Sequence, residues 1–178
     1  MKHILLAISL LFIVQSINSQ EKKKGFTFFT GSFNLSLAIN EDYTIEDDDQ
    51  PLLVPTAIMI RTGFGYQFNR RIGVSFNVGY DYHYKYVITA IPTYISVKYN
   101  LWENDNDAFF AEYGQGKMWR PTPKYPDGNY YNFGLGWQMN TGSKWKPVLQ
   151  FMYHRKKIAG FDNGNLDSVS LGIGFTFF

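Results

Sequence analysis

The final residues of the chain, 168–178, alternate large apolar side chains with small or polar ones and finish on Phe178. A period of two residues is typical of a β-strand, because successive side chains point to opposite faces. In the wall of a membrane barrel the apolar series faces lipid and the other series faces inward. Gly172 and Gly174 belong to the second series, so they mark a crowded inner face. The pattern predicts a strand in the wall of a narrow, lipid-embedded barrel.

The first residues have the three parts of a secretory signal peptide. Lys2 and His3 give a basic start, an apolar run covers 4–14, and small and polar residues occupy 16–19. The apolar run is too short to span a bilayer. We expect a signal peptide over 1–19 with cleavage near 19/20, and one domain over 20–178. Because no Cys lies at the cleavage region, a lipoprotein anchor is excluded.

Composition is typical of membrane strands. The chain has no Cys, 19% aromatic residues and a mean hydropathy of −0.23. Beyond the leader, no segment is continuously apolar for the roughly 18 residues that a transmembrane helix needs, so helical spans are not expected. The formal net charge of +2 is too small to indicate nucleic acid as a partner.

Segments of alternating residues are separated by turns and polar connections. They cover 26–39, 56–68, 72–86, 91–101, 109–117, 130–140, 145–155 and 166–178. The connections after the second, fourth and sixth segments are short. The connections after the other segments are mostly longer and cover 40–53, 87–90, 118–128 and 156–165. This asymmetry is typical of outer-membrane barrels, whose short turns face the periplasm. We therefore predict an all-β fold: a closed eight-stranded antiparallel transmembrane β-barrel.

Aromatic residues gather near both ends of these segments, as expected for rings at two membrane interfaces. A soluble eight-stranded barrel such as a lipocalin is the alternative, but its outward face would be polar. The predicted outward series contains Val74, Phe76, Leu135, Ile173 and Phe175. We therefore favour the membrane barrel.

The strand over 91–99 and the glycine-rich aromatic final strand carry a family resemblance. On these segments the chain resembles the small eight-stranded outer-membrane barrels of the OmpX and OmpA transmembrane-domain type, and especially the barrel family of Bacteroidota. The resemblance implies the outer membrane of a Gram-negative cell, insertion by the outer-membrane assembly machinery, and contact with lipopolysaccharide and other outer-membrane proteins. One departure is that the lipid-facing series ends at Phe177, so that Phe178 is one step out of phase.

The inward series carries charged and polar side chains, which we assign to ion pairs and a polar plug. These residues are Arg61, Asp81, His83, Lys98, Glu112 and Gln150. Strand pairing places Lys98 opposite Glu112 and Arg61 one diagonal step from Asp81, so both are predicted ion pairs. An ion or proton path is the alternative, but an eight-stranded interior is just wide enough for side chains to fill. The plug is favoured.

A basic segment, His154, Arg155, Lys156 and Lys157, is a candidate contact for lipopolysaccharide phosphates. The segment also resembles the end of the PagL-like lipid A deacylases, which have a His-x-Ser-Asn pattern. His154 matches the base, but Lys156 stands at the position of the nucleophilic Ser, and Asp167 lies near that of the acidic residue. Because no Ser in 154–168 is within expected reach of His154, we predict no enzyme activity and no catalytic residue.

The predicted outer connections carry the residues that a barrel wall does not require. The first is acidic and is a candidate partner or cation loop through Glu41, Asp42, Glu46, Asp47, Asp48 and Asp49. Its spacing lacks the EF-hand pattern, so a solvated loop is favoured over a Ca²⁺ site. The connection over 120–128 is proline-rich. We expect no metal or cofactor. We predict a structural and interaction protein that works through its extracellular loops, alone or as an accessory subunit of a larger complex. The alternative is a lipid A hydrolase.

Overall fold

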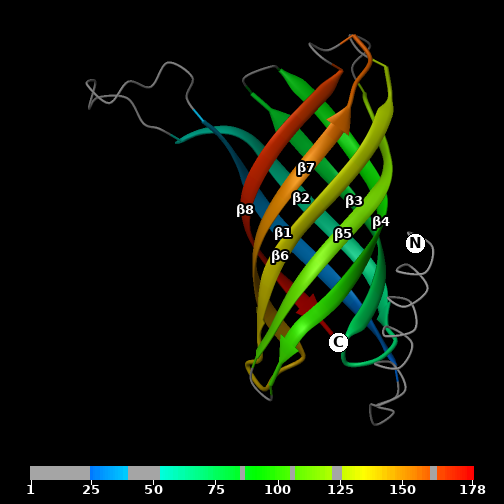
Figure 1. Ribbon diagram of the computed structural model, residues 1–178, viewed down its shortest axis with the longest axis vertical. Helices are drawn as coiled ribbons and strands as arrows, with labels where there is room; N and C mark the ends of the chain where they lie inside the picture. The colour runs from blue at the N-terminus through cyan, green and yellow to red at the C-terminus, as the bar shows by residue number, and fades with distance from the viewer. Residues whose placement is uncertain (1–24, 40–52, 85–86, 105–106, 122–125, 161–163) are drawn as a thin grey trace, which may run out of the picture.

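The computed structural model describes residues 25–39, 53–84, 87–104, 107–121, 126–160 and 164–178, and its strands close into a barrel (Figure 1). The strands are β1 (Phe26–Ile39), β2 (Leu53–Gln67), β3 (Ile72–His83), β4 (Ile88–Glu103), β5 (Asp107–Trp119), β6 (Gly128–Met139), β7 (Trp145–Lys157) and β8 (Asn165–Phe177). Each pairs antiparallel with the next, and β8 returns to β1. None of the described residues lies in a helix long and apolar enough to cross a membrane. The predicted eight-stranded antiparallel barrel is confirmed.

Several strand ends differ from those that the sequence indicated. The connection predicted at 87–90 is wrong, because β4 begins at Ile88, which pairs with His83. Strand β3 ends at His83 rather than at residue 86, and β7 continues two residues beyond Arg155 to Lys157. A strand continues for as long as its neighbour offers hydrogen-bonding partners, and pairing between distant segments is not visible in local alternation.

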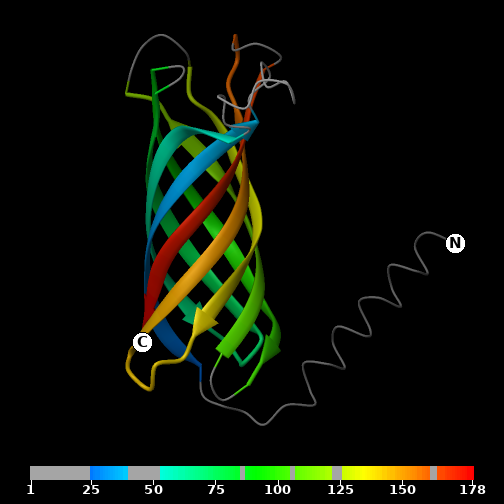
Figure 2. The same cartoon turned by 90° about the vertical axis from the view of Figure 1, so that its left-hand side faces the viewer.

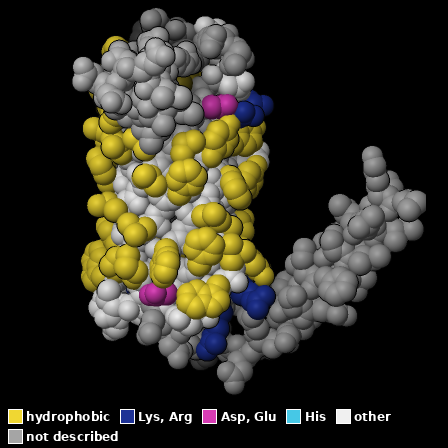
Figure 3. Space-filling model, turned by 60° about the vertical axis from the view of Figure 1, so that its left-hand side comes forward, with side chains coloured by type: hydrophobic (Ala, Val, Ile, Leu, Met, Phe, Trp, Pro, Cys, Tyr) yellow, Lys and Arg dark blue, Asp and Glu magenta, His cyan; other side chains and the backbone are white. Residues whose placement is uncertain are grey.

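The strands lie obliquely around the barrel axis, with the short turns and the C-terminus at one end (Figures 1 and 2). The outer face is apolar: Phe64 is 62% exposed, Phe76 56% and Ile173 63%. Figure 3 shows hydrophobic side chains spread along the wall on the face in view. A continuous apolar surface of this extent marks a lipid-facing wall rather than a water-facing one.

The interior is packed with large side chains as well as polar ones. Some aromatic residues lie outside the two predicted belts: Phe28, Tyr94, Phe110 and Tyr130 are buried inside the barrel. Glycine on a neighbouring strand makes room for such rings: a Cβ at Gly136 would lie 2.2 Å from Cζ of Phe110. In a barrel this narrow, bulky residues on one strand fit only where small ones face them.

The two final residues point to different sides of the wall. The ring of Phe177 lies 4.8 Å from that of Trp145, whereas the ring of Phe178 contacts Phe26 edge-on at 4.8 Å. The Lys146 ammonium lies 4.9 Å from the centre of the Phe178 ring. Phe178 therefore belongs to the inner series and lies at the short-turn end of the lumen.

Candidate functional site

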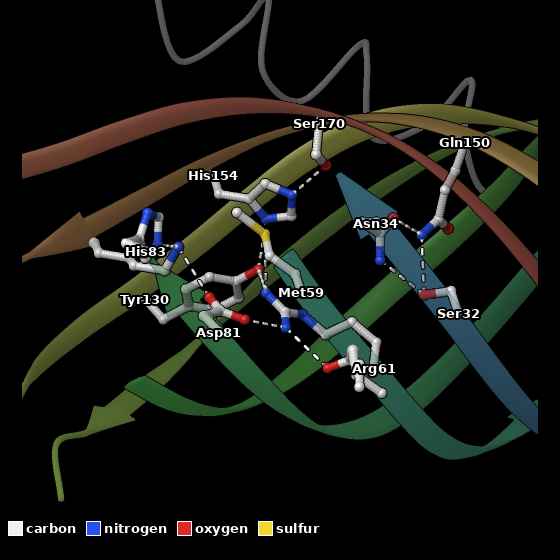
Figure 4. Close-up of polar contacts among 12 residues, drawn as sticks. Ser32, Asn34, Met59, Arg61, Asp81, His83, Tyr130, Gln150, His154 and Ser170 are labelled. Carbon is white, nitrogen blue, oxygen red and sulfur yellow. Dashed lines mark hydrogen bonds and ion pairs between the residues drawn. The ribbon is translucent and has the colours of Figure 1, made fainter. Parts of the chain in front are cut away.

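A buried charge cluster lies inside the barrel between β2, β3 and β7 (Figure 4). Arg61 forms an ion pair with Asp81 through Nη1 and Oδ1, one diagonal step apart in the β2–β3 register. On the other side, Nζ of Lys156 lies 2.8 Å from Oδ2 of Asp81. The exposed fractions of these side chains are 6% for Arg61 and 0% for the other two. One carboxylate thus holds two cations away from water.

Hydrogen bonds extend this cluster to five strands. Lys156 Nζ donates to His83 Nε2 at 2.9 Å, and Arg61 Nη2 donates to the Tyr130 hydroxyl at 3.4 Å. The same hydroxyl lies 2.6 Å from His154 Nδ1, and His154 Nε2 lies 2.8 Å from Ser170 Oγ. We call these residues the lumen network; its members are Arg61, Asp81, His83, Tyr130, His154, Lys156 and Ser170.

Apolar and polar side chains fill the lumen on either side of the network. Towards the long-connection end, Met118, Ile158 and Leu166 belong to a buried apolar cluster. Towards the middle, Gln150 Nε2 donates to Asn34 Oδ1 at 2.5 Å and to Ser32 Oγ at 3.0 Å. A cavity of about 60 Å³ remains among these side chains. That space is several times smaller than a typical ligand pocket, so the lumen is closed to solutes of ordinary size.

The predicted ion pair between Lys98 and Glu112 is wrong, although the two residues do face each other across β4 and β5. The Lys98 ammonium lies 5.2 Å from the ring centres of both Phe28 and Phe110, and donates to Gln138 Oε1 at 3.4 Å. The structure shows no ion pair between Lys98 and Glu112. The prediction did not place Phe28 and Phe110 in the lumen. It therefore missed the two rings between which Lys98 lies.

No family model and no curated protein matches the chain, whereas solved structures with a similar fold are found. Neisserial surface protein A superposes with a TM-score of 0.62 at 9% identity, covering 87% of this chain and 99% of that chain. The N-terminal β-barrel domain of Pseudomonas aeruginosa OprF superposes with a TM-score of 0.53 at 12% identity, covering 85% of this chain and 97% of that domain. The chain has the fold of the small outer-membrane barrels.

In an outer-membrane barrel, the four residues of the basic segment divide between lipid and lumen. Arg155 and Lys157 point outward, whereas His154 and Lys156 are buried in the lumen network. The assignment of His154 and Lys156 as lipopolysaccharide contacts is therefore wrong. The reason is the period of two: β7 continues to Lys157, so alternate residues of this segment face opposite sides.

The two outward members of the segment have different partners. Arg155 forms two hydrogen bonds with the Asp167 carboxylate, at 3.0 and 2.8 Å. Lys157 lies 5.5 Å from the centre of the Tyr131 ring. Lys157 is paired across β6 with Asn129, and Asn129 with Lys117 of β5, so the two lysines share one row on the outer wall. Sequence reasoning did not identify Lys117 in this row.

Tyr130 and Ser170 are lumen-network residues that sequence reasoning missed. Tyr130 is fully buried, whereas its neighbour Tyr131 is partly exposed. The two are adjacent on β6, so they point to opposite sides of the wall. The prediction considered serine residues near His154 only as far as Ser168. Ser170 of β8, two residues further on, lies within hydrogen-bonding distance of His154. Extending the inward series of β8 by one step would have found it.

Some predicted features lie outside the described residues. The signal peptide over 1–19 and the acidic loop with Glu41, Asp42 and Glu46–Asp49 are among them. The proline-rich connection is described only in part, at 120–121 and 126–128. Within the described ranges, no group of three or more His, Cys, Asp or Glu residues could hold a metal ion.

Proposed function

We propose that this chain is a non-enzymatic outer-membrane barrel that acts as a structural and interaction protein. Its working surface is the set of connections at the long-connection end, and it acts alone or as an accessory subunit of a larger outer-membrane complex. The signal peptide over 1–19 supports export, and the aromatic final strand supports insertion by the outer-membrane assembly machinery. Both steps are part of this proposal.

The observation that carries the proposal is the closed lumen. The charges of Arg61, Asp81 and Lys156 are accounted for by two ion pairs, and Lys98 lies between two aromatic rings and bonds Gln138. The wall itself is accounted for by contact with lipid. When the wall contacts lipid and the interior is filled by side chains, the connections are the part of the barrel that can vary without unfolding it. This supports the acidic and proline-rich connections as the interaction surface.

The row of Lys117, Asn129 and Lys157 supports contact with lipopolysaccharide. The next row down the outer wall contains Gln115, Tyr131 and Arg155, and the row after it Tyr113, Phe133 and Tyr153, so the surface passes from charged and polar to aromatic. Such an order matches a lipid with a phosphorylated headgroup, since lysine ammonium groups bind phosphate as point charges. Arg155 is already paired with Asp167, so we assign phosphate contact to the lysines.

We expect the purified protein to form no stable large channel in a planar bilayer. The cavity of about 60 Å³ between the network and the middle of the lumen leaves no continuous path for hydrated ions. Single-channel recording is the measurement, with a porin of known conductance inserted under the same conditions as the control. Steady conductance of porin size would contradict the closed lumen.

We expect that deletion of residues 46–50 leaves the barrel folded but weakens retention of the proteins that co-purify from native membranes. The reason is that these residues come after β1 and before β2 in the sequence, so the deletion removes no residue of either strand. Folding is checked by the heat-dependent shift of small barrels on gels, and retention by quantitative mass spectrometry. The matched control replaces Phe76 of the lipid face by Leu. If the control loses the partners and the deletion retains them, the working surface is the outer wall instead.

One observation favours the alternative of a lipid A hydrolase: Ser170 Oγ and His154 Nε2 lie 2.8 Å apart, as a nucleophile and its base do. Two facts oppose it. Both side chains are buried inside the barrel, at 0% and 2% exposure, and the second nitrogen of His154 is held by Tyr130 rather than by a carboxylate. An acyl chain in the bilayer has no access to this pair. The alternative requires that His154→Ala changes the mass of the cell's lipid A, and we expect no change.

A further inference from the structure

A polar basin opens at the short-turn end of the barrel, opposite the connections discussed above. Its volume is about 500 Å³, within the range of small-ligand pockets. The lining includes cations such as Lys98 and Lys146, the carboxylates of Glu103 and Asp107, amides such as Asn100 and Gln138, and apolar side chains that include the rings of Phe26 and Phe178. This basin is separate from the lumen network and does not enter into the proposed function.

Two lysines point into the basin without a carboxylate partner. Neither Lys98 nor Lys146 forms an ion pair with any residue that the structure describes. The Lys98 ammonium contacts aromatic rings and Gln138, and Lys146 lies over the Phe178 ring. The ammonium groups of Lys98 and Lys146 repel each other. Glu112 and Glu103 attract Lys98, but neither forms an ion pair with it. Withdrawing ammonium groups from water is costly unless an anion compensates them.

The acidic side chains in the basin lining are bonded to other groups. Glu103 Oε2 accepts a hydrogen bond from Asn100 Nδ2 at 3.4 Å, and Asp107 Oδ1 accepts one from the Asn140 backbone at 3.4 Å. These hydrogen bonds leave the charge of both carboxylates in place, but the lining carries more cations than carboxylate side chains: Arg70, Arg71, Lys98 and Lys146 against Glu103 and Asp107. The basin therefore has a local excess of positive charge.

Asn100 adds an unused acceptor. Its side chain is nine-tenths buried, and its Nδ2 donates to the Arg70 carbonyl at 2.6 Å and to Glu103. These two acceptors fix the amide orientation, so that Oδ1 faces away from them, and Oδ1 has no hydrogen-bond partner. A buried carbonyl oxygen without a donor is rare in folded proteins. A ligand that fits this basin thus carries an N–H or O–H donor as well as a negative charge.

We propose that the basin binds the free carboxylate end of a short peptide. The carboxylate lies between Lys98 and Lys146, a peptide N–H donates to Asn100 Oδ1, and apolar side chains of the peptide contact the aromatic rings of the basin. Amide side chains in the lining match the polar groups of a peptide backbone. Because short turns face the periplasm in barrels of this kind, the ligand is a peptide of that compartment.

The test uses the full chain refolded in detergent micelles and followed by NMR. The probes are acetylated trialanine with a free carboxylate, the same peptide as its amide, and inorganic phosphate. We expect saturable shifts of the Lys98, Asn100 and Lys146 signals with the free acid, and at least tenfold weaker binding of the amide. Equal binding of acid and amide overturns the proposal. Phosphate binding as tight as that of the acid also overturns it, because the basin is then a general anion site.

Variants locate the site. The double substitution Lys98→Met and Lys146→Met is expected to weaken binding of the free acid at least tenfold, while Lys144→Met, an exposed lysine outside the basin lining, leaves it unchanged. Equal weakening by both overturns the proposal, since the peptide is then attracted by overall charge. The heat-dependent gel shift reports whether the double variant folds. If it does not fold, the comparison of acid with amide on the unchanged protein decides the question by itself.

Discussion

Replacing Asp81 by Ala is expected to lower the free energy of unfolding by about 3–5 kcal/mol, because removing one partner of a buried ion pair leaves an uncompensated charge. Here the loss is shared by two cations, Arg61 and Lys156, both of which depend on the single carboxylate of Asp81. Neither cation can reach water without disrupting the wall. We therefore expect this to be the most destabilising single substitution in the lumen network.

The measurement is urea unfolding in lipid vesicles, followed by tryptophan fluorescence. Asp167→Ala is the matched control, because it breaks an ion pair with Arg155 in which both side chains are about two-fifths exposed, at 44% and 40%. Exposed pairs contribute little to stability because water already compensates the separated charges. If the two substitutions lower stability equally, burial does not govern the charge cluster and the described role of Asp81 is wrong.

Replacing Leu135 by Arg is expected to lower the free energy of unfolding by about 2–4 kcal/mol, the cost of a cation at the midplane of the lipid face. Leu135 points outward near the middle of β6, between Ala111 and Phe151 on the neighbouring strands. The cost of the Leu135→Arg substitution comes from placing a cation in the surrounding hydrocarbon and not from packing inside the barrel. The effect therefore depends on depth in the membrane.

Leu101→Arg provides the depth control, since Leu101 is 53% exposed near the short-turn end of β4. Near an interface the same change costs about 0–1 kcal/mol, because the guanidinium reaches the headgroup region. Unfolding of both variants in vesicles of one lipid composition compares the two costs. A larger loss from Leu101→Arg than from Leu135→Arg would place the membrane midplane elsewhere on the barrel.

The strand pattern illustrates what local sequence could predict. Alternation identified every strand and placed most of their bounds to within two residues, with 26–39 matching β1 at both ends. It also gave the β2–β3 register that brings Arg61 to Asp81. It failed at strand ends, as at Ile88 and Lys157, because the pairing of a terminal residue depends on a partner strand and not on its own neighbours in sequence.

The sequence by itself determined the fold and the two faces of the wall, because a period of two residues assigns each side chain to lipid or to lumen. Only the tertiary structure decided which lumen residues meet. Lys156 reaches Asp81 across 75 positions of sequence, and Arg61 reaches the Tyr130 hydroxyl across 69. Lys98, opposite Glu112 in register, lies instead between two rings. Register fixes neighbours within the sheet, whereas contacts across a closed barrel depend on its curvature and on which glycines leave space for larger side chains.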